Sequence, residues 1–234
     1  MSPTVEEGRD PAYRRFPAVA AGVFPHLLFL LLAGGSWSRS GAGPAPAGAQ
    51  ETPTVEASAL LEKTLFRIDV ARLNLQFGGD TAARLEALLE AAGPETSLAD
   101  SVAEVAIHSR DATARLTFLW GIGFDRFMEN VQRSVEVARE AGLLDPGFAR
   151  SLSDSLPGWY APIRERGVKD GDTMTYRIRG DTMRIVFRTR KDSVMVDQRA
   201  VGRQSRLSVL GGFLSAGSEF REGLLDSLLD RKLR

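Results

Sequence analysis

A guanidinium and a carboxamide stand one helical turn apart near the middle of the chain, at Arg126 and Asn130. At about 100° per residue they fall on one flank of a helix, next to an apolar stripe. Such a pair can orient a carboxylate or a carbonyl while the apolar surface holds the rest of a ligand. Two solvated polar side chains on an exposed flank are the simpler interpretation, and the residues alone leave both open.

The elements that must position this pair are predicted to be a buried strand and the helix that follows it. Leu116, Phe118 and Trp120 recur at every second position, which is typical of a strand with one apolar face. Apolar residues next recur at helical spacing, at Phe124, Phe127, Met128, Val131, Val135 and Ala138. Gly142 is expected to end this helix in a left-handed cap.

Other site chemistry is limited by the residue types available. The chain has no cysteine, which excludes disulfides, thiolate nucleophiles and zinc–thiolate sites. His108 is the single histidine after residue 50, so a His-rich metal site cannot be built and no nucleophile motif completes a Ser–His–Asp triad. Asp170, Asp172 and Asp181 could form an all-oxygen metal site, although aspartates at turns usually serve turn chemistry. We therefore expect no metal, no cofactor and no catalytic residue.

The charge balance argues against a polyanionic partner. The 234 residues include 30 basic and 30 acidic side chains. Four basic and three acidic residues lie within positions 1–50, which leaves 26 basic and 27 acidic residues for the remainder. We therefore expect no nucleic-acid partner, and no polybasic cluster marks a protein of the membrane surface.

Residues 1–50 are predicted to be a targeting segment with a Gly/Ala/Pro-rich linker, and residues 51–234 the folded domain. An arginine pair precedes an apolar stretch over 16–33, whose densest part is LLFLLLA. Ala47 and Ala49 fit a signal-peptidase site, so we expect cleavage after Ala49 and export to the periplasm or the medium. The alternative is an uncleaved N-terminal membrane anchor. Prolines interrupt the roughly 20 apolar residues that a spanning helix needs, so we expect no stable membrane span after processing.

Residues 64–77 are predicted to form a strand with a β-bulge. The apolar alternation shifts phase by one residue around Ala71 and Arg72, and one extra residue in the strand explains the shift. With the bulge, the polar side chains share one face, at Arg67, Asp69, Arg72, Asn74 and Gln76.

A helix and a short strand are expected before the central strand. Residues 81–92 repeat leucine at helical spacing, with Asp80 as the N-cap. Residues 101–110 are predicted to be a short strand that carries Val105 and Ile107.

Helical and hairpin patterns follow the central helix. A second helix is predicted around 148–156, where Pro157 interrupts it. Residues 167–190 alternate on both sides of a Gly180-Asp181 turn, which predicts a β-hairpin, and a further strand follows.

The chain is expected to close with helices over 207–233, interrupted by Gly211, Gly212 and Gly217. The order of elements predicts an α+β fold, with a large antiparallel sheet covered by helices.

Four segments resemble the chalcone isomerase-like family, including its bacterial exported members. They are KTLFRIDVARLNLQF, LTFLWGIGFDRFMENVQRSV, RGVKDGDTMTYRI and SEFREGLLDSLL, and together they span most of residues 55–234. The resemblance implies an open-faced β-sandwich, in which a ligand cleft lies between the sheet and its helices.

The resemblance also implies which positions line that cleft. The plant enzymes of this fold cyclise chalcones, whereas relatives without the full site bind fatty acids or act as non-catalytic partners. The family's helix lysine and asparagine correspond to Arg126 and Asn130, and its strand threonine corresponds to Asp69. Its active-site tyrosine corresponds to Gly123 and its strand arginine to Ala57, so two demanding groups are missing.

We therefore predict non-catalytic binding of a fatty acid or similar apolar anion. The expected ligand contacts are Arg126, Asn130, Asp69, Arg67 and Arg72. An isomerase of chalcone isomerase type on another substrate is one alternative. A protein-interaction module, whose cleft is filled by its own side chains, is the second.

Overall fold

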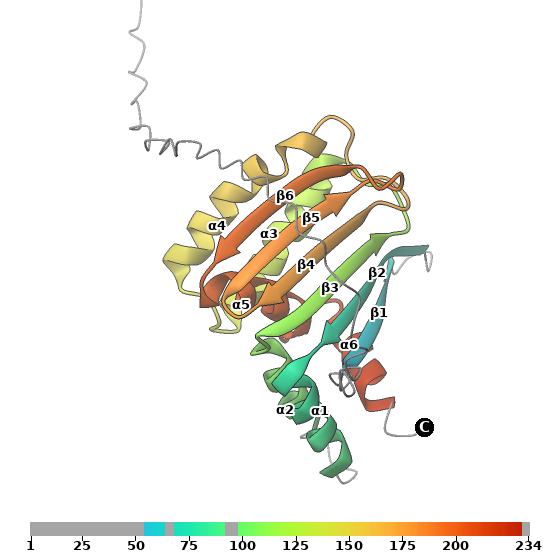
Figure 1. Ribbon diagram of the computed structural model, residues 1–234. Coiled ribbons are helices and arrows are strands. Elements are labelled where there is room, and N and C mark those ends of the chain that lie inside the picture. The colour runs from blue at the N-terminus through green and yellow to red at the C-terminus, as the bar shows by residue number, and fades with distance from the viewer. Residues whose placement is uncertain (1–53, 64–67, 92–97, 231–234) are drawn as a thin grey trace, which may run out of the picture. The chain divides into compact units, whose positions relative to one another are not determined.

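Six strands form one open antiparallel sheet in which each strand pairs with the next along the chain (Figure 1). The structure is a computed structural model that describes residues 54–63, 68–91 and 98–230. The strands are β1 (Val55–Lys63), β2 (Ile68–Phe77), β3 (Asp111–Phe118), β4 (Thr173–Arg179), β5 (Thr182–Arg188) and β6 (Val194–Val201). The fold is therefore α+β, as predicted, with a six-stranded antiparallel sheet packed against helices.

The helices leave one face of the sheet open. Two helices follow β2, namely α1 (Gly79–Ala91) and α2 (Leu98–Ile107). After β3 come α3 (Phe124–Glu140), α4 (Pro146–Trp159) and the short η1 (Ala161–Ile163), and after β6 come α5 (Arg203–Leu214) and α6 (Arg221–Leu229). Figure 1 shows α3 and α5 behind the sheet, while the near face of β2–β5 has no helix over it. Within the described residues, no helix is both long and apolar enough to cross a membrane.

Strand alternation decides which side chains the helices cover. On β3 every second residue is buried, from Ala112 to Phe118, and on β4 Met174, Tyr176 and Ile178 are buried in the same way. The intervening positions carry threonine and arginine and point to the open face. Burying a large apolar side chain contributes about 1.5–3 kcal/mol, so this single covered face holds the layers together.

The first strand and the last helix lie side by side. The Ser58 amide donates to Ser227 Oγ at 3.0 Å. A Cβ added to Gly223 would lie 3.1 Å from the Ala59 Cβ, so the absence of a side chain lets α6 approach β1 closely. The two ends of the described chain thus share one packing contact.

Two glycines predicted to interrupt the last helices instead lie inside α5. A Cβ added to Gly212 would stand 2.8 Å from the Ser134 carbonyl oxygen of α3, and one added to Gly211 only 2.5 Å from Leu143 Cδ1. Glycine costs about 1 kcal/mol in a helix interior. That prediction was wrong because the close approach of α5 to α3 requires residues without side chains.

The short strand predicted at 101–110 is also wrong, since those residues belong largely to α2. Val102, Val105 and Ala106 are buried at helical spacing, and they turn α2 toward the core. Two apolar residues two positions apart are too short a pattern to distinguish the alternation of a strand from the period of a helix.

The predicted β-bulge exists close to its expected place. Leu61 pairs with Ala71 while Glu62 pairs with Asp69, so Val70 is the extra residue. The β1 strand itself was not predicted.

The hairpin at the Gly180-Asp181 turn is confirmed, since Arg179 and Thr182 pair directly. Gly142, with φ of 74°, ends α3 as predicted. Its amide donates to the Arg139 carbonyl at 2.9 Å, and the Leu143 amide donates to the Ala138 carbonyl at 3.0 Å.

Three further local predictions were wrong. Asp80 lies inside the first turn of α1 rather than before it, and Pro157 lies inside α4, which continues to Trp159. Trp120 is 58% exposed because β3 ends at Phe118, before the alternation reaches it.

Candidate functional site

Arg126 and Asn130 lie on the solvent side of α3. The Arg126 side chain is 66% exposed, and its Nη1 lies 2.8 Å from Glu129 Oε2 on the same helix. Asn130 is exposed, and its backbone carbonyl accepts a hydrogen bond from Ser134 Oγ at 3.1 Å. A surface pair of this kind contributes at most about 1 kcal/mol. The geometry thus matches two solvated residues, and their ligand-binding role stays a prediction.

The other predicted ligand contacts do not join them. Arg72 pairs with Thr117 across β2 and β3 and points to the open face, opposite to the face that α3 covers. Arg126 and Arg72 therefore cannot line one cleft. Arg67 lies outside the described residues, and of Asp69 only the backbone position in β2 is described.

Aromatic rings fill the space between α3 and the sheet. Phe127 of α3 meets the Tyr160 ring at 5.0 Å, the Phe118 ring at 6.1 Å and the Phe187 ring at 6.4 Å between centroids. All four side chains are buried. Edge-to-face contacts of this kind contribute about 0.5–1.5 kcal/mol each beyond area burial. The layer in which a fatty-acid tail was expected is occupied by the protein's own side chains.

Two buried tyrosines meet at one sulfur atom beside these rings. The hydroxyls of Tyr160 and Tyr176 donate to Met174 Sδ at 3.2 and 3.3 Å. Burial raises the pKa of the Tyr160 hydroxyl well above its usual range and that of Tyr176 to about 12. Both hydroxyls therefore stay neutral at ordinary pH. No sequence pattern predicts this pair, because its members lie on different elements and meet only through the tertiary fold.

Asp172 is a buried carboxylate whose four hydrogen bonds tie the loop at 166–172 to the turn after β5. Arg166 donates to its two oxygens at 2.7 and 3.2 Å, and the amides of Lys169 and Arg190 donate at 2.8 and 3.1 Å. Burial opposes the charged form, but these donors outweigh it and hold the pKa of Asp172 below its usual value. The carboxylate is thus a structural tie.

The three aspartates considered for an oxygen metal site do not converge. Asp170 faces Arg190 at 3.4 Å, while Asp181 lies at the far turn of the β4–β5 hairpin, where it faces Arg110 and Arg206. Over the described ranges, no group of three or more metal-ligating side chains comes together.

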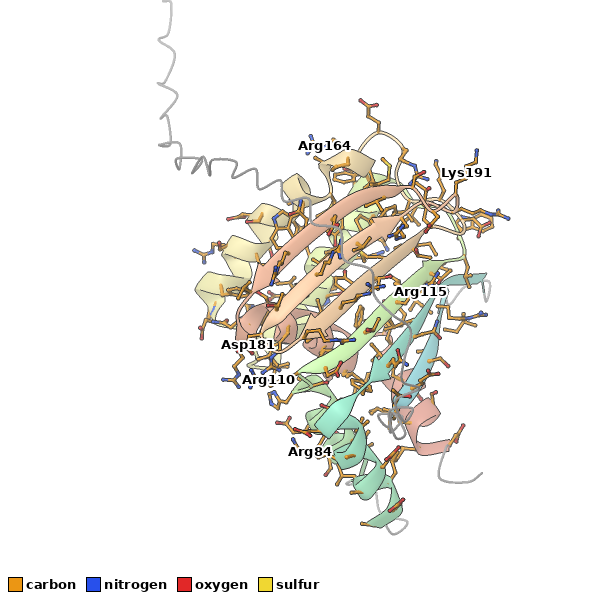
Figure 2. The ribbon with its side chains drawn as sticks, viewed as in Figure 1. Arg84, Arg110, Arg115, Arg164, Asp181 and Lys191 are labelled. Atoms are coloured by element: carbon orange, nitrogen blue, oxygen red, sulfur yellow. The ribbon has the colours of Figure 1, made fainter. Side chains whose placement is uncertain are left out.

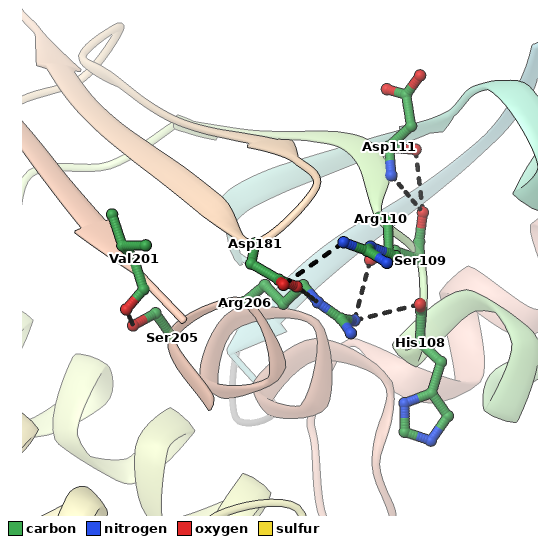
Figure 3. Close-up of polar contacts among 8 residues, drawn as sticks. All are labelled: His108, Ser109, Arg110, Asp111, Asp181, Val201, Ser205 and Arg206. Atoms are coloured by element: carbon green, nitrogen blue, oxygen red, sulfur yellow. Dashed lines mark hydrogen bonds and ion pairs between the residues drawn. The ribbon is translucent and has the colours of Figure 1, made fainter. Parts of the chain in front are cut away.

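A buried arginine ties α5 to the start of β3 and the hairpin turn. Arg206 Nη1 donates to the carbonyls of His108 and Ser109 at 3.1 and 3.2 Å, and its Nε faces Asp181 at 3.4 Å (Figure 3). The His108 ring lies 2.9 Å from Glu104 on the outer side of α2. His108 thus serves the structure through its carbonyl, and its ring faces no described nucleophile.

A shallow groove of about 330 Å³ lies between α2 and α6. Its apolar floor includes Leu225 and Leu229, and Arg221 is its cation. Arg221 already contacts Asp100 at 2.6 Å, and Glu222 and Asp226 also line the groove. An apolar anion is therefore disfavoured there by the surrounding carboxylates.

The open face of the sheet carries a row of arginines in direct register. Arg177 pairs with Arg184 across β4 and β5, and Arg184 pairs with Arg199 across β5 and β6. Arg115 on β3 pairs with Thr175 and is therefore diagonal to Arg177, and Figure 2 shows it on the face turned to the viewer. Adjacent strands lie about 4.8 Å apart, so one anion can contact the guanidiniums of two neighbouring strands at the same time.

Positive charge exceeds negative charge on this face. Among side chains that the structure describes, the register places seven arginines there, namely Arg72, Arg115, Arg177, Arg179, Arg184, Arg188 and Arg199. Among the same described side chains the carboxylates on this face are three, namely Glu56, Asp111 and Asp197, so the described side chains carry an excess of four positive charges.

Some of these arginines have carboxylate partners and others do not. Arg184 donates from Nε to Asp197 at 2.8 Å, and Arg179 pairs with Asp111. On this face, four guanidiniums have no hydrogen-bond or ion-pair partner among the described residues, namely those of Arg72, Arg115, Arg177 and Arg199. We call these four the open-face arginines.

This face was not predicted from the sequence, because its basic residues do not cluster along the chain. The open-face arginines are spread over four strands, and only strand pairing brings them together. The alternation of arginine with buried residues in β4 and β5 was the signal that could have found them. Neither a known protein family nor any curated protein matches this chain, so its function must be argued from this geometry.

Proposed function

We propose that this protein is a non-enzymatic binding module that recognises an anionic partner on the open face of its sheet. The observation that carries the proposal is the in-register row of Arg177, Arg184 and Arg199, in which Asp197 balances only the middle charge. Like charges directly opposite each other on a sheet are destabilising. An anion placed between the outer two would relieve that repulsion and gain charge-assisted hydrogen bonds.

Arginine suits this role better than lysine would. Its planar guanidinium presents five donors in a fork that matches phosphate and carboxylate oxygens. The threonines between the arginines, such as Thr113 and Thr175, add short hydroxyl donors in neighbouring positions.

The side chains beneath the sheet support binding rather than catalysis. The buried tyrosines are held neutral, Asp172 is fully engaged, and the His108 ring faces a carboxylate at the edge of α2. The filled ring cluster around Phe127 favours the interaction module over the fatty-acid binder among the functions predicted from the sequence.

Membership of the chalcone isomerase-like family and export remain parts of this proposal. The bulged β1–β2 pair and the passage from β3 into α3 support the family. The residues that support export lie outside the described part of the chain.

The test is calorimetric titration of a heparin oligosaccharide, a soluble polyanion, into wild type and Arg177→Gln/Arg199→Gln. An exposed charge pair contributes up to about 1 kcal/mol, so the double variant should bind about thirtyfold more weakly. Arg84→Gln/Arg150→Gln is the matched control, since it removes the same charge from exposed positions on α1 and α4. Equal affinities in the two double variants at low salt would refute the proposal.

A further inference from the structure

We infer that the anionic partner is the surface of a membrane that contains anionic phospholipid, an inference that rests on the proposed function. Charge alone does not select this partner. The second observation is where the exposed apolar side chains lie.

One row of paired residues crosses the whole sheet with apolar side chains at both ends. It runs from Leu60 on β1 through Arg72, Thr117, Thr173 and Arg188 to Val194 on β6. Leu60 is 40% exposed and Val194 is 48% exposed, and both share the open face with the arginines. This row thus carries an exposed apolar residue on each edge strand, with Arg72 and Arg188 between them.

Trp120 stands at the same end of the sheet. It follows Thr117 by three positions, just past the end of β3, and is 58% exposed. Tryptophan favours the membrane interface because its ring is apolar while its indole N–H keeps a polar partner. Lys191, in the β5–β6 turn that closes this end, adds a further exposed cation (Figure 2).

This combination fits lipid better than nucleic acid. Single-stranded nucleic acid is held by aromatic rings on which bases stack. Of the described side chains that the register places on the open face, none is aromatic. Leucine and valine beside guanidiniums match instead a surface that offers phosphate groups above hydrocarbon.

The mode of docking follows from these positions. The open-face arginines contact the phosphates, and the end with Leu60, Trp120 and Val194 enters the interface more deeply. Val201, 69% exposed on the same face, lies at the other end of β6 and adds apolar contact there. Each arginine near an anionic surface strengthens binding about fivefold.

The experiment is co-sedimentation of the full chain with vesicles of phosphatidylcholine alone or mixed with phosphatidylglycerol. The neutral vesicles set the baseline, including any contribution of the apolar residues 16–33. We expect a charge-dependent increase that Arg115→Gln/Arg177→Gln weakens about thirtyfold, while Arg84→Gln/Arg150→Gln stays within about twofold of wild type. Thermal unfolding of each variant establishes that the fold is intact.

Tryptophan fluorescence reports the apolar contact separately. Emission should shift to shorter wavelength on anionic vesicles, and Trp120→Phe should abolish the shift. Raising salt from about 0.1 M to about 1 M shortens the screening length from about 10 Å to about 3 Å, so vesicle binding should fall to the neutral baseline.

The failures of the two proposals are distinguishable. Binding of heparin or duplex DNA that depends on Arg177, without charge-dependent vesicle binding, would overturn the membrane inference and leave the proposed function standing. Vesicle binding that Arg115→Gln/Arg177→Gln does not weaken would also overturn the inference. Binding to neither heparin nor anionic vesicles would overturn both.

Discussion

Replacing Asp172 by asparagine should destabilise the whole domain. Each carboxylate oxygen accepts one hydrogen bond from Arg166 and one from a backbone amide, of Lys169 or of Arg190. Asparagine keeps one accepting oxygen and presents an NH₂ group to the other two donors. One charge-assisted bond and one amide partner are lost in a buried site, so the free energy of unfolding should fall by about 3–5 kcal/mol. That is a large fraction of the about 5–15 kcal/mol typical of a domain.

The assay is urea unfolding of wild type, Asp172→Asn and the control Asp170→Asn at several pH values. Asp170 is exposed and faces Arg190 at 3.4 Å, so its replacement should change stability by less than about 0.5 kcal/mol. The pKa of Asp172 is lowered in the folded state, so its stabilising contribution is present above its ordinary value of 3.8 and is lost as pH falls through the lower folded value. The difference in the free energy of unfolding between wild type and Asp172→Asn should therefore become smaller in acid. A gap below about 1 kcal/mol at neutral pH, or one unchanged in acid, would refute the reasoning.

Three further outcomes follow from single contacts. Gly212→Ala should lower the free energy of unfolding by about 1–3 kcal/mol, because the new Cβ would press on the Ser134 carbonyl. Gly158→Ala in α4 has open space around it and should instead raise the free energy of unfolding by up to about 1 kcal/mol. Chemical denaturation of both variants tests this pair of outcomes. The Tyr176 pKa is raised to about 12, so between about pH 10 and 12 the unfolded chain holds fewer protons than the folded one. Stability should therefore fall by up to about 3 kcal/mol over that range, and less in Tyr176→Phe, as measured by alkaline unfolding curves. Arg126→Gln should leave heparin affinity and stability unchanged within about 0.5 kcal/mol, because its exposed side chain pairs only within its own helix; a larger loss of affinity would return α3 to consideration as the site.

Long regular patterns made parts of the fold predictable from sequence. Helix α3 runs for 17 residues, long enough for the stripe around Phe127 to fix its period and for Gly142 to mark its end. The β4–β5 hairpin alternates on both sides of a two-residue turn, which also fixes its register. Local periodicity was sufficient in both cases.

Short or weakly apolar segments were not predictable in the same way. The inner face of β1 includes Ala57 and Ala59, whose small side chains give little alternation in hydropathy. The strand predicted in place of α2 rested on two apolar residues, and tertiary burial of Val102 and Ala106 decided for the helix.

The candidate site was least accessible to sequence reasoning because it depends on long-range register. Arg72 and Arg199 are separated by most of the domain, and only four successive strand pairings, from β2 to β6, place both on one face. A neutral total charge concealed that segregation. Arg126 was predicted to contact a ligand because it lies beside a clear apolar stripe of a helix. Such a stripe does not show whether a cleft opens next to it.

The contact between β1 and α6 has a consequence for synthesis on the ribosome. The inner face of β1 packs against a helix that the ribosome completes more than a hundred residues later. The ribosome adds about 5–20 residues per second, so roughly 10–30 s pass between the synthesis of Ala59 and that of Gly223, which packs against it. During that interval the nascent sheet has an uncovered edge strand, which is a template for pairing with other chains. A binding factor that holds the emerging chain would therefore raise the yield of folded protein more than it would for a domain whose first strand is closed by its neighbours in sequence.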